Sequence, residues 1–300
     1  MRTLLILTAL AMGTTAIGKP SDTIYAQELV NRLISNHPDV AAIALYVKRP
    51  ESPDTSIIAS NNGRIGQKAD AQDLKVVTTG VPILGVTESG KRVQVEVVLK
   101  DANLRSIGAL RIEFPYKQGG DKDAFRRRAE GIRDELARRI SHVANLLEPA
   151  QFDTGIPTRT YGQSLVDKAL ARHPKVVILA LHATPAKSSE NVIVASNIGR
   201  IGKKADEDDM HVIATGEDKL ELNETGDRYE VEQTLADVSG LTIGAVGVVF
   251  AYSKGQDTAP LQSEAKAVKA ELSRRISNVS NLLEPFPFDA RYSADSYAQH

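Results

Sequence analysis

The sequence predicts an α+β fold of two tandem domains, each an antiparallel sheet flanked by an N-terminal helix and a long C-terminal helix. The first observation is an internal duplication: shifted by 136 residues, the 300-residue chain matches itself without a gap, with about 54 of 127 aligned positions identical. This period exceeds the roughly 20–50 residues of a solenoid repeat, so each copy is a domain. The second observation is the element order, which mixes helices with hairpins and has little strand–helix–strand alternation.

The chain is expected to divide into a leader, two domains and a tail. The predicted parts are a signal peptide at 1–18, copy one at 22–153, copy two at 158–289 and a disordered tail at 290–300. The boundary between the copies carries Pro149, Gly155 and Pro157, residues that interrupt regular structure. The linker is short, so we expect the copies to lie close together.

The leader has the features of a secretory signal. Arg2 supplies a positive charge, residues 4–11 supply an apolar core, and Ala16 and Gly18 supply the small residues before a cleavage site. A buried first helix and an uncleaved anchor are the alternatives. No later segment is long enough to span a bilayer, so the cleaved product is expected to be periplasmic or secreted, without stable membrane insertion. The chain has no cysteine, which excludes disulfides and thiolate metal sites.

The first half of each copy is predicted to be a helix followed by a strand pair. Apolar residues at helical spacing predict a helix over Tyr25–Asn36, and Pro38 ends it. A continuous apolar run predicts a strand over Val40–Val47 that is covered on both faces, with its counterpart over Val176–Leu181. Thr55–Ser60 is predicted to be the second strand, joined to the first by a polar loop that contains proline.

The second half begins with a short helical or turn segment opened by Asp70, and Leu74–Thr79 is predicted to be a short strand. Alternating valines predict a strand over Arg92–Leu99. A turn at Asp101–Asn103 leads into an apolar strand over Ser106–Phe114. These two strands are expected to pair as an antiparallel hairpin.

The last element of each copy is predicted to be a long helix, over Asp121–Leu147 in copy one and Thr258–Leu283 in copy two. The side chain of Asp121 is expected to cap its helix. Apolar residues step along one face of copy one's helix at spacings of three and four: Ile132, Leu136, Ile140, Val143 and Leu147.

Two segments of copy two resemble tandem Cache and PAS-like extracytoplasmic sensor domains. The hairpin Asp237–Phe250 is similar to the last two strands of those domains, where an Asp-x-x-Gly turn leads into an Ile-Gly-Ala strand. The strand Val192–Ser196, followed by Ile201, Gly202 and the acidic Asp206, is similar to the upstream part of the Cache pattern. The resemblance implies a small-molecule pocket between the sheet and its covering loops.

The densest shared motif, at 59–70 and 195–206, supplies most of the candidate ligand-binding residues. These candidates are Asn61, Arg64, Lys68 and Asp70 in copy one, and His182, Asn197, Arg200, Lys204 and Asp206 in copy two. Arginine can grip a carboxylate or phosphate bidentately, so one interpretation is a lid that contacts an anionic ligand. The alternative is a strand-to-helix turn with an Asp cap. Copy one has Leu104 where copy two has Gly240, and we hypothesise that copy two binds while copy one is the scaffold.

Charge and motifs limit the classes of function. A net charge of −1 does not indicate binding to nucleic acid or to an anionic membrane. No catalytic motif, metal-ligand spacing or cofactor motif is present, and the acidic run at 206–209 is expected to open a helix rather than bind metal. We therefore expect a protein that is not an enzyme and needs no cofactor.

Three functions remain open. The leading prediction is an exported small-molecule-binding, sensor-like protein without its own signalling output domain, whose bound state is presented to a membrane receptor or envelope protein. The first alternative is a structural or partner-binding envelope protein that acts through its long helices. The second is a hydrolase, which would need titratable groups that converge in a cleft.

Overall fold

The computed structural model describes residues 19–186 and 188–287. The expected signal peptide and tail lie outside these described residues, as do the last two residues expected for copy two. In the described part of the chain, no helix is long and apolar enough to cross a membrane.

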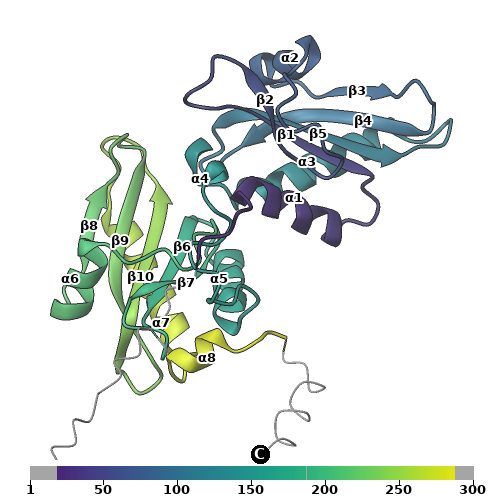
Figure 1. Cartoon of the computed structure of the whole chain (residues 1–300). Coiled ribbons are helices and arrows are strands. Elements are labelled where there is room, and N and C mark those ends of the chain that lie inside the picture. The colour runs from purple at the N-terminus through teal and green to yellow at the C-terminus, as the bar shows by residue number, and fades with distance from the viewer. Residues whose placement is uncertain (1–18, 187, 288–300) are drawn as a thin grey trace, which may run out of the picture.

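Each copy forms one five-stranded antiparallel sheet (Figure 1). In copy one the strand order is β2-β1-β5-β4-β3, and in copy two it is β7-β6-β10-β9-β8. The strands of copy one are β1 Ala42–Lys48, β2 Thr55–Ser60, β3 Ile83–Val86, β4 Arg92–Lys100 and β5 Ser106–Pro115. Those of copy two are β6 Val176–Ala183, β7 Val192–Ser196, β8 Lys219–Leu222, β9 Arg228–Ala236 and β10 Thr242–Ala251.

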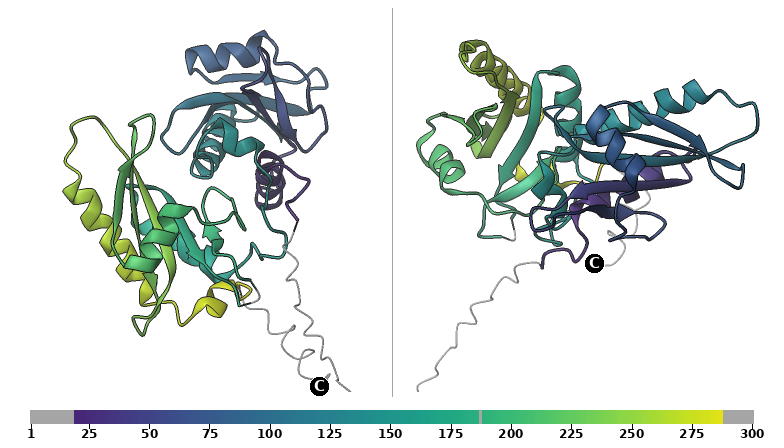
Figure 2. Two further views of the ribbon diagram at one scale, coloured as in Figure 1. Left: turned by 60° about the vertical axis from the view of Figure 1, so that its left-hand side comes forward. Right: turned by 90° about the horizontal axis from the view of Figure 1, so that it is seen from above.

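The helices divide between the two faces of each sheet. Copy one contains α1 Tyr25–Asn36, α2 Ala71–Thr79, α3 Lys122–Ala137 and α4 Val143–Leu147. Copy two contains α5 Tyr161–Arg172, α6 Glu207–Thr215, α7 Ala259–Ser273 and α8 Val279–Leu283. The main core of each copy lies between the sheet and the pair α1 and α3, or α5 and α7. The single helix α2 or α6 lies over the opposite face (Figures 1 and 2).

Much of the predicted element order is confirmed. The helix over Tyr25–Asn36 and the strand over Thr55–Ser60 have the expected bounds. The predicted hairpin is the antiparallel pair β4 and β5. Asp121 caps α3, because its side chain accepts hydrogen bonds from the backbone N–H groups of Asp123 and Ala124. These features depend on residues close together in sequence, so local patterns were enough to predict them.

The strand predicted over Leu74–Thr79 is wrong, because this segment lies within helix α2. The side chains of Asp70 and Asp73 form a reciprocal capping box that starts the helix, and Gly80, with φ 69°, ends it in the left-handed region. The β-branched residues of the segment favour a strand. The capping box at its start and the left-handed Gly80 at its end stabilise a helix instead. The actual edge strand, β3, begins after this helix.

The single long C-terminal helix is also wrong, because each copy breaks it into two helices. In copy one, α3 ends at Ala137 and α4 begins at Val143. Between them the carbonyl of Ile140 accepts a hydrogen bond from the N–H of Ala102, in the turn between β4 and β5. A carbonyl that bonds this turn does not continue the helical ladder, and Ile276 makes the equivalent bond in copy two.

Replacement of Leu104 by glycine is expected to stabilise copy one by about 1 kcal/mol, because Leu104 has φ 63° and a left-handed conformation is costly for a residue with a Cβ. Its side chain is 67% exposed, so little packing is lost. Urea unfolding followed by circular dichroism measures the change. The matched control is Gly240→Leu at the equivalent turn of copy two, where φ is 88° and we expect the opposite sign. A lower midpoint for Leu104→Gly would contradict the prediction.

Candidate functional site

A cleft of about 580 Å³ lies on the face of the second sheet that carries α6. Alternate residues of β6, β9 and β10 form its floor, while α6 and the loop before it form one wall. Copy one contributes Ser141 and His142 to the rim, so the cleft lies between the two copies. Its aliphatic lining consists of Ile178, Ala180, Ile193, Ile198 and Val249.

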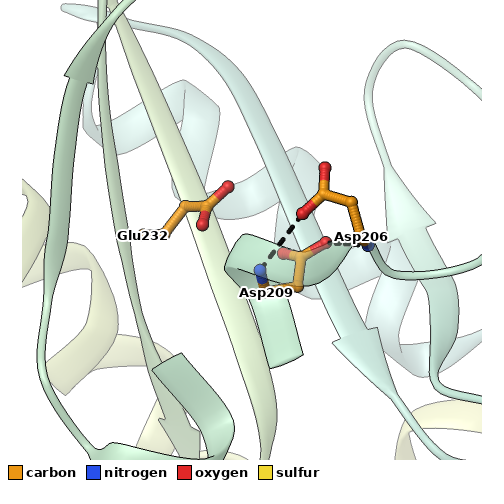
Figure 3. Close-up of side chains that lie close together, drawn as sticks. All are labelled: Asp206, Asp209 and Glu232. Carbon is orange, nitrogen blue, oxygen red and sulfur yellow. Dashed lines mark hydrogen bonds between the residues drawn. The ribbon is translucent and has the colours of Figure 1, made fainter. Parts of the chain in front are cut away.

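Three carboxylates converge in this cleft (Figure 3). Asp206 and Asp209 lie at the start of α6, and Glu232 points toward them from β9; one oxygen from each lies within 4.8 Å of the others. Glu232 is only 7% exposed, and its Oε2 has no hydrogen-bond partner among the described residues. Burial, followed by the charges of Asp209 and other nearby carboxylates, raises the pKa of Glu232 to about 8.

The helix cap uses only one oxygen of each aspartate. Asp206 Oδ1 accepts hydrogen bonds from the backbone N–H groups of Asp208 and Asp209, at 3.1 and 3.2 Å. Asp209 Oδ2 accepts from the N–H of Asp206 at 3.1 Å. Within the described chain, the second oxygens, Asp206 Oδ2 and Asp209 Oδ1, accept no hydrogen bond. The capping box therefore orients both carboxylates and leaves each with a free oxygen.

Copy one has the same three acids, but there an arginine fills the space between them. The Arg111 guanidinium on β5 lies 2.7 Å from Asp73 Oδ1, 3.1 Å from Asp70 Oδ2 and 3.1 Å from Glu96 Oε1. It also stacks over the Tyr46 ring, with its central carbon 5.0 Å from the ring centroid. The cavity left on this face of copy one is only about 10 Å³.

Gly247 of copy two occupies the position of Arg111, because the two positions differ by 136 residues. A Cβ built on Gly247 would lie 3.3 Å from Glu230 Oε1, so a side chain there would enter the cleft. Burial, followed by the charge of Glu221, raises the pKa of Glu230 to about 7. Copy two thus has cleft carboxylates at Glu221 and Glu230 where copy one has Gly85 and Gln94, and it has glycine in place of Arg111.

His182, a predicted site residue, lines the floor of the cleft where copy one has Tyr46. Its Nδ1 lies 3.2 Å from Asp209 Oδ2 but makes no hydrogen bond. Burial lowers the pKa of His182 to about 4, so the imidazole is neutral at pH 7. Burial likewise raises the pKa of Asp209 to about 6. A neutral histidine adds no positive charge beside Asp206 and Asp209.

The predicted anion-contacting residues of copy two are engaged elsewhere. Asn197 does not line the cleft: its Oδ1 accepts from the N–H of Leu179, and its Nδ2 donates to carbonyls of Val177 and of Arg138 in copy one. Arg200 lines the cleft but makes two 2.9 Å contacts with Glu148 of copy one. These residues fasten the two copies together.

Lys204 and Asp206 also line the cleft. The Lys204 ammonium lies 3.1 Å from Glu190, so its charge is balanced there. Asp206 serves as the N-cap of α6, as the turn interpretation predicts. Asp206 is the one acidic residue that the shared motif contributes to the lining of the cleft.

In copy one, the candidates Asn61, Arg64 and Lys68 are exposed. Asn61 joins the end of β2 to the start of β1, because its Oδ1 accepts from the N–H of Ile43 and its Nδ2 donates to the carbonyl of Ala41. Lys68 pairs with Asp54 at 2.6 Å. Asp70, the remaining candidate, caps α2 and contacts Arg111.

The opposite end of the cleft is basic. Arg228 on β9 is buried and donates to the carbonyl of Ser141 in copy one, and burial lowers its pKa. Arg105 of copy one pairs with Asp101 and, across the junction, with Asp227, each at 2.7 Å. The arginines at this rim thus join the copies, whereas no lysine or arginine of the described residues forms a salt bridge with Asp206, Asp209 or Glu232.

Four residues of the cleft were not predicted as site residues from the sequence: Asp209, Glu230, Glu232 and Gly247. One signal could have found them: Asp70, Asp73 and Glu96 recur at the 136-residue spacing, while Arg111 alone among the four becomes glycine. In addition, β9 alternates so that Arg228, Glu230 and Glu232 share one face.

Comparisons with known proteins show similarities to solved structures only. No family model matches the chain, and no curated protein matches it. The GAF domain of A. Aeolicus nlh2 is 12% identical over 38% of this chain and 81% of that chain, with a TM-score of 0.29. PelD from Pseudomonas aeruginosa PAO1 is 15% identical over 93% of this chain and 91% of that chain, with a TM-score of 0.30. The GAF domain/HD domain protein from Geobacter sulfurreducens is 12% identical over 39% of this chain and 92% of that chain, with a TM-score of 0.29. Similarities this distant indicate neither a family nor a ligand, so the assignment to Cache domains stays a prediction.

Proposed function

We propose that this chain is an exported, non-catalytic, sensor-like protein that binds a small molecule in the cleft of copy two, while copy one serves as the scaffold. The observation that supports this most directly is the contrast between equivalent faces of the two sheets. Copy two has a cleft of about 580 Å³, walled in part by Ser141 and His142 of copy one, and the equivalent face of copy one, which carries Arg111 and Tyr46, has about 10 Å³. The same face of the sheet is therefore filled by side chains in copy one and open in copy two.

The size and lining of the cleft fit this proposal. Sites for small molecules usually measure about 300–1,000 Å³ and combine apolar walls with a few oriented polar groups. Here Ile178, Ile193 and Val249 provide apolar contacts, and Asp206 and Glu232 provide oriented carboxylates. The acidic end favours a cationic ligand group over the anionic ligand that the sequence motif favoured, because the predicted Arg200 and Lys204 already have acidic partners.

The position of the cleft also supports a sensing role. Arg228 and Arg200 line the cleft and bind copy one through the carbonyl of Ser141 and the carboxylate of Glu148. A ligand that contacts these side chains would change the free energy of docking between the copies. In the proposal, a membrane receptor or envelope protein recognises the docked arrangement.

The alternative of a partner-binding protein that acts through long helices has less support. That function would place an apolar patch on the exposed side of α3 or α7. Among the described residues, the exposed large hydrophobic side chains lie outside both helices: Ile65, Leu74, Val81, Val86, Leu104, Met210, Leu220, Leu222, Val238, Leu241 and Phe286. No specific observation therefore favours this alternative.

A thermal-shift screen tests the proposed site. The panel contains amino acids, amines, carboxylates, nucleotides and sugars, and a ligand at 100 times its Kd should stabilise the protein by about 2.7 kcal/mol. We expect Gly247→Arg to abolish the shift by filling the cleft as Arg111 does. The matched control is Gly85→Arg, which adds the same charge at an exposed position of β3 where a side chain meets no neighbour. A ligand whose shift survives Gly247→Arg binds elsewhere and refutes the proposed site.

A further inference from the structure

We propose that the ligand of copy two carries a guanidinium or primary ammonium group, which binds among Asp206, Asp209 and Glu232 where the guanidinium of Arg111 lies in copy one. This inference rests on the proposed function, since it names the chemical class of the molecule that the cleft takes. In copy one the Arg111 side chain occupies the position proposed for the ligand. Copy two has Gly247 at the equivalent position and therefore has no side chain there.

The contacts of Arg111 define the binding geometry atom by atom. In copy one the capping box uses Asp70 Oδ1 and Asp73 Oδ2, and the guanidinium takes the other oxygens, Asp70 Oδ2 and Asp73 Oδ1. Copy two has the same capping box, which leaves Asp206 Oδ2 and Asp209 Oδ1 free. The acceptors that hold the cation in copy one are therefore present and oriented in copy two.

Burial gives an independent reason to expect a cation. Glu232 is more than nine-tenths buried, and neither of its oxygens has a hydrogen-bond partner among the described residues. By contrast, Glu96 Oε1 of copy one accepts from Arg111 and Gln94. A buried carboxylate without a partner costs several kcal/mol, and a cation that donates hydrogen bonds removes this cost. The nearby Lys219 does not serve, because it is paired with Asp208 and Glu221.

The shape of the cleft favours an organic cation over a metal ion. A divalent ion such as Ca²⁺ takes about six to eight oxygen ligands, whereas the capping box leaves one free oxygen on each aspartate. A cleft of about 580 Å³ is also far larger than an ion, and its walls include Ile178, Ile193 and Val249. An alkyl chain attached to the cationic group would pack against these side chains.

Titration calorimetry with agmatine and methylguanidinium chloride tests the inference. We expect the unaltered protein to bind agmatine, Glu232→Gln to weaken binding about tenfold or more, and Gly247→Arg to abolish it. Gly85→Arg should bind as the unaltered protein does. Binding should also release protons, because the cation lowers the raised pKa values of the cleft carboxyls, so the heat should depend on the ionisation enthalpy of the buffer.

The outcomes separate this inference from the proposed function. Binding of CaCl₂ or MnCl₂ but neither organic cation, with loss in Gly247→Arg, would overturn the organic class. Binding of a carboxylate or a neutral sugar alone, lost in Gly247→Arg, would refute the cation and leave the proposed site intact. If Gly247→Arg changes the binding of no compound in the panel, both the inference and the proposed site fail.

Discussion

Replacement of Arg111 by alanine is expected to destabilise copy one by about 3–5 kcal/mol, the usual effect of removing one partner from a buried ion cluster. The guanidinium contacts Asp70, Asp73 and Glu96, and the side chains of the last two are almost completely buried. Among the described residues, Arg111 is the only cation that forms a salt bridge with either of these two carboxylates. The uncompensated buried charge, rather than lost packing alone, makes the effect large.

Hydrogen exchange followed by mass spectrometry measures this effect, because peptides from the two copies report separately. Arg92→Ala is the matched control: its side chain is 51% exposed and pairs with Glu113, so its loss should cost less than about 1 kcal/mol. The double variant Arg111→Ala with Glu96→Gln should recover part of the loss, because one buried charge is removed. Millimolar methylguanidinium should also stabilise Arg111→Ala. Equal effects of Arg111→Ala and Arg92→Ala would show that the cluster is not energetically important.

Raising the pH from about 5 to about 8 is expected to destabilise copy two by up to about 6 kcal/mol in the absence of ligand, the sum for two carboxyls whose folded-state pKa values are about 7 and about 8. Burial raises the pKa of Glu232 to about 8 and that of Glu230 to about 7, above the ordinary value of about 4.4 in an unfolded chain. Between these values the folded state binds more protons than the unfolded state. The stabilisation is therefore complete below about pH 4 and is lost as the pH rises to about 8.

The neighbours of these carboxyls determine the direction of the pH effect. The charges of Asp206, Asp209 and Glu221 raise the pKa of Glu230, and Lys219 opposes them. Urea unfolding at a series of pH values gives the slope, and Glu232→Gln should flatten it because the strongest contributor no longer titrates. Gly247→Arg should flatten it as well, since a fixed cation favours the charged carboxylates. A slope that is unchanged in both variants would contradict this account.

The two copies share one arrangement of carboxylates but differ in whether the chain itself places a cation among them. Each copy places three carboxylates at the junction of a helix cap and a strand, and each requires a positive charge there. Copy one supplies that charge from Arg111, which fills the cavity and stabilises the domain. Copy two leaves the charge to be supplied from outside, so its stability should depend on ligand and on pH. This difference between duplicated domains is a direct physical basis for one copy to bind and the other to support it.

Local sequence patterns predicted much of the fold and only part of the site. The caps at Asp70 and Asp121 and the β4–β5 hairpin depend on residues a few positions apart, so spacing alone identified them. The long helix was wrong because its break depends on a hydrogen bond between Ile140 and the distant Ala102. The motif at 195–206 was noticed, but Asn197 and Arg200 serve the junction between the copies, which a sequence pattern does not show.

The sequence by itself determined the duplication, the α+β class, the caps and the substitution of arginine by glycine between the copies. Only the tertiary structure decided that this substitution opens a cleft. Asp209 and Glu232 lie 23 residues apart in the chain and meet because the sheet brings β9 under the first turn of α6. Burial of Asp209 and Glu232, which raises the pKa of both carboxyls, follows from packing against the whole sheet and is encoded at no single position.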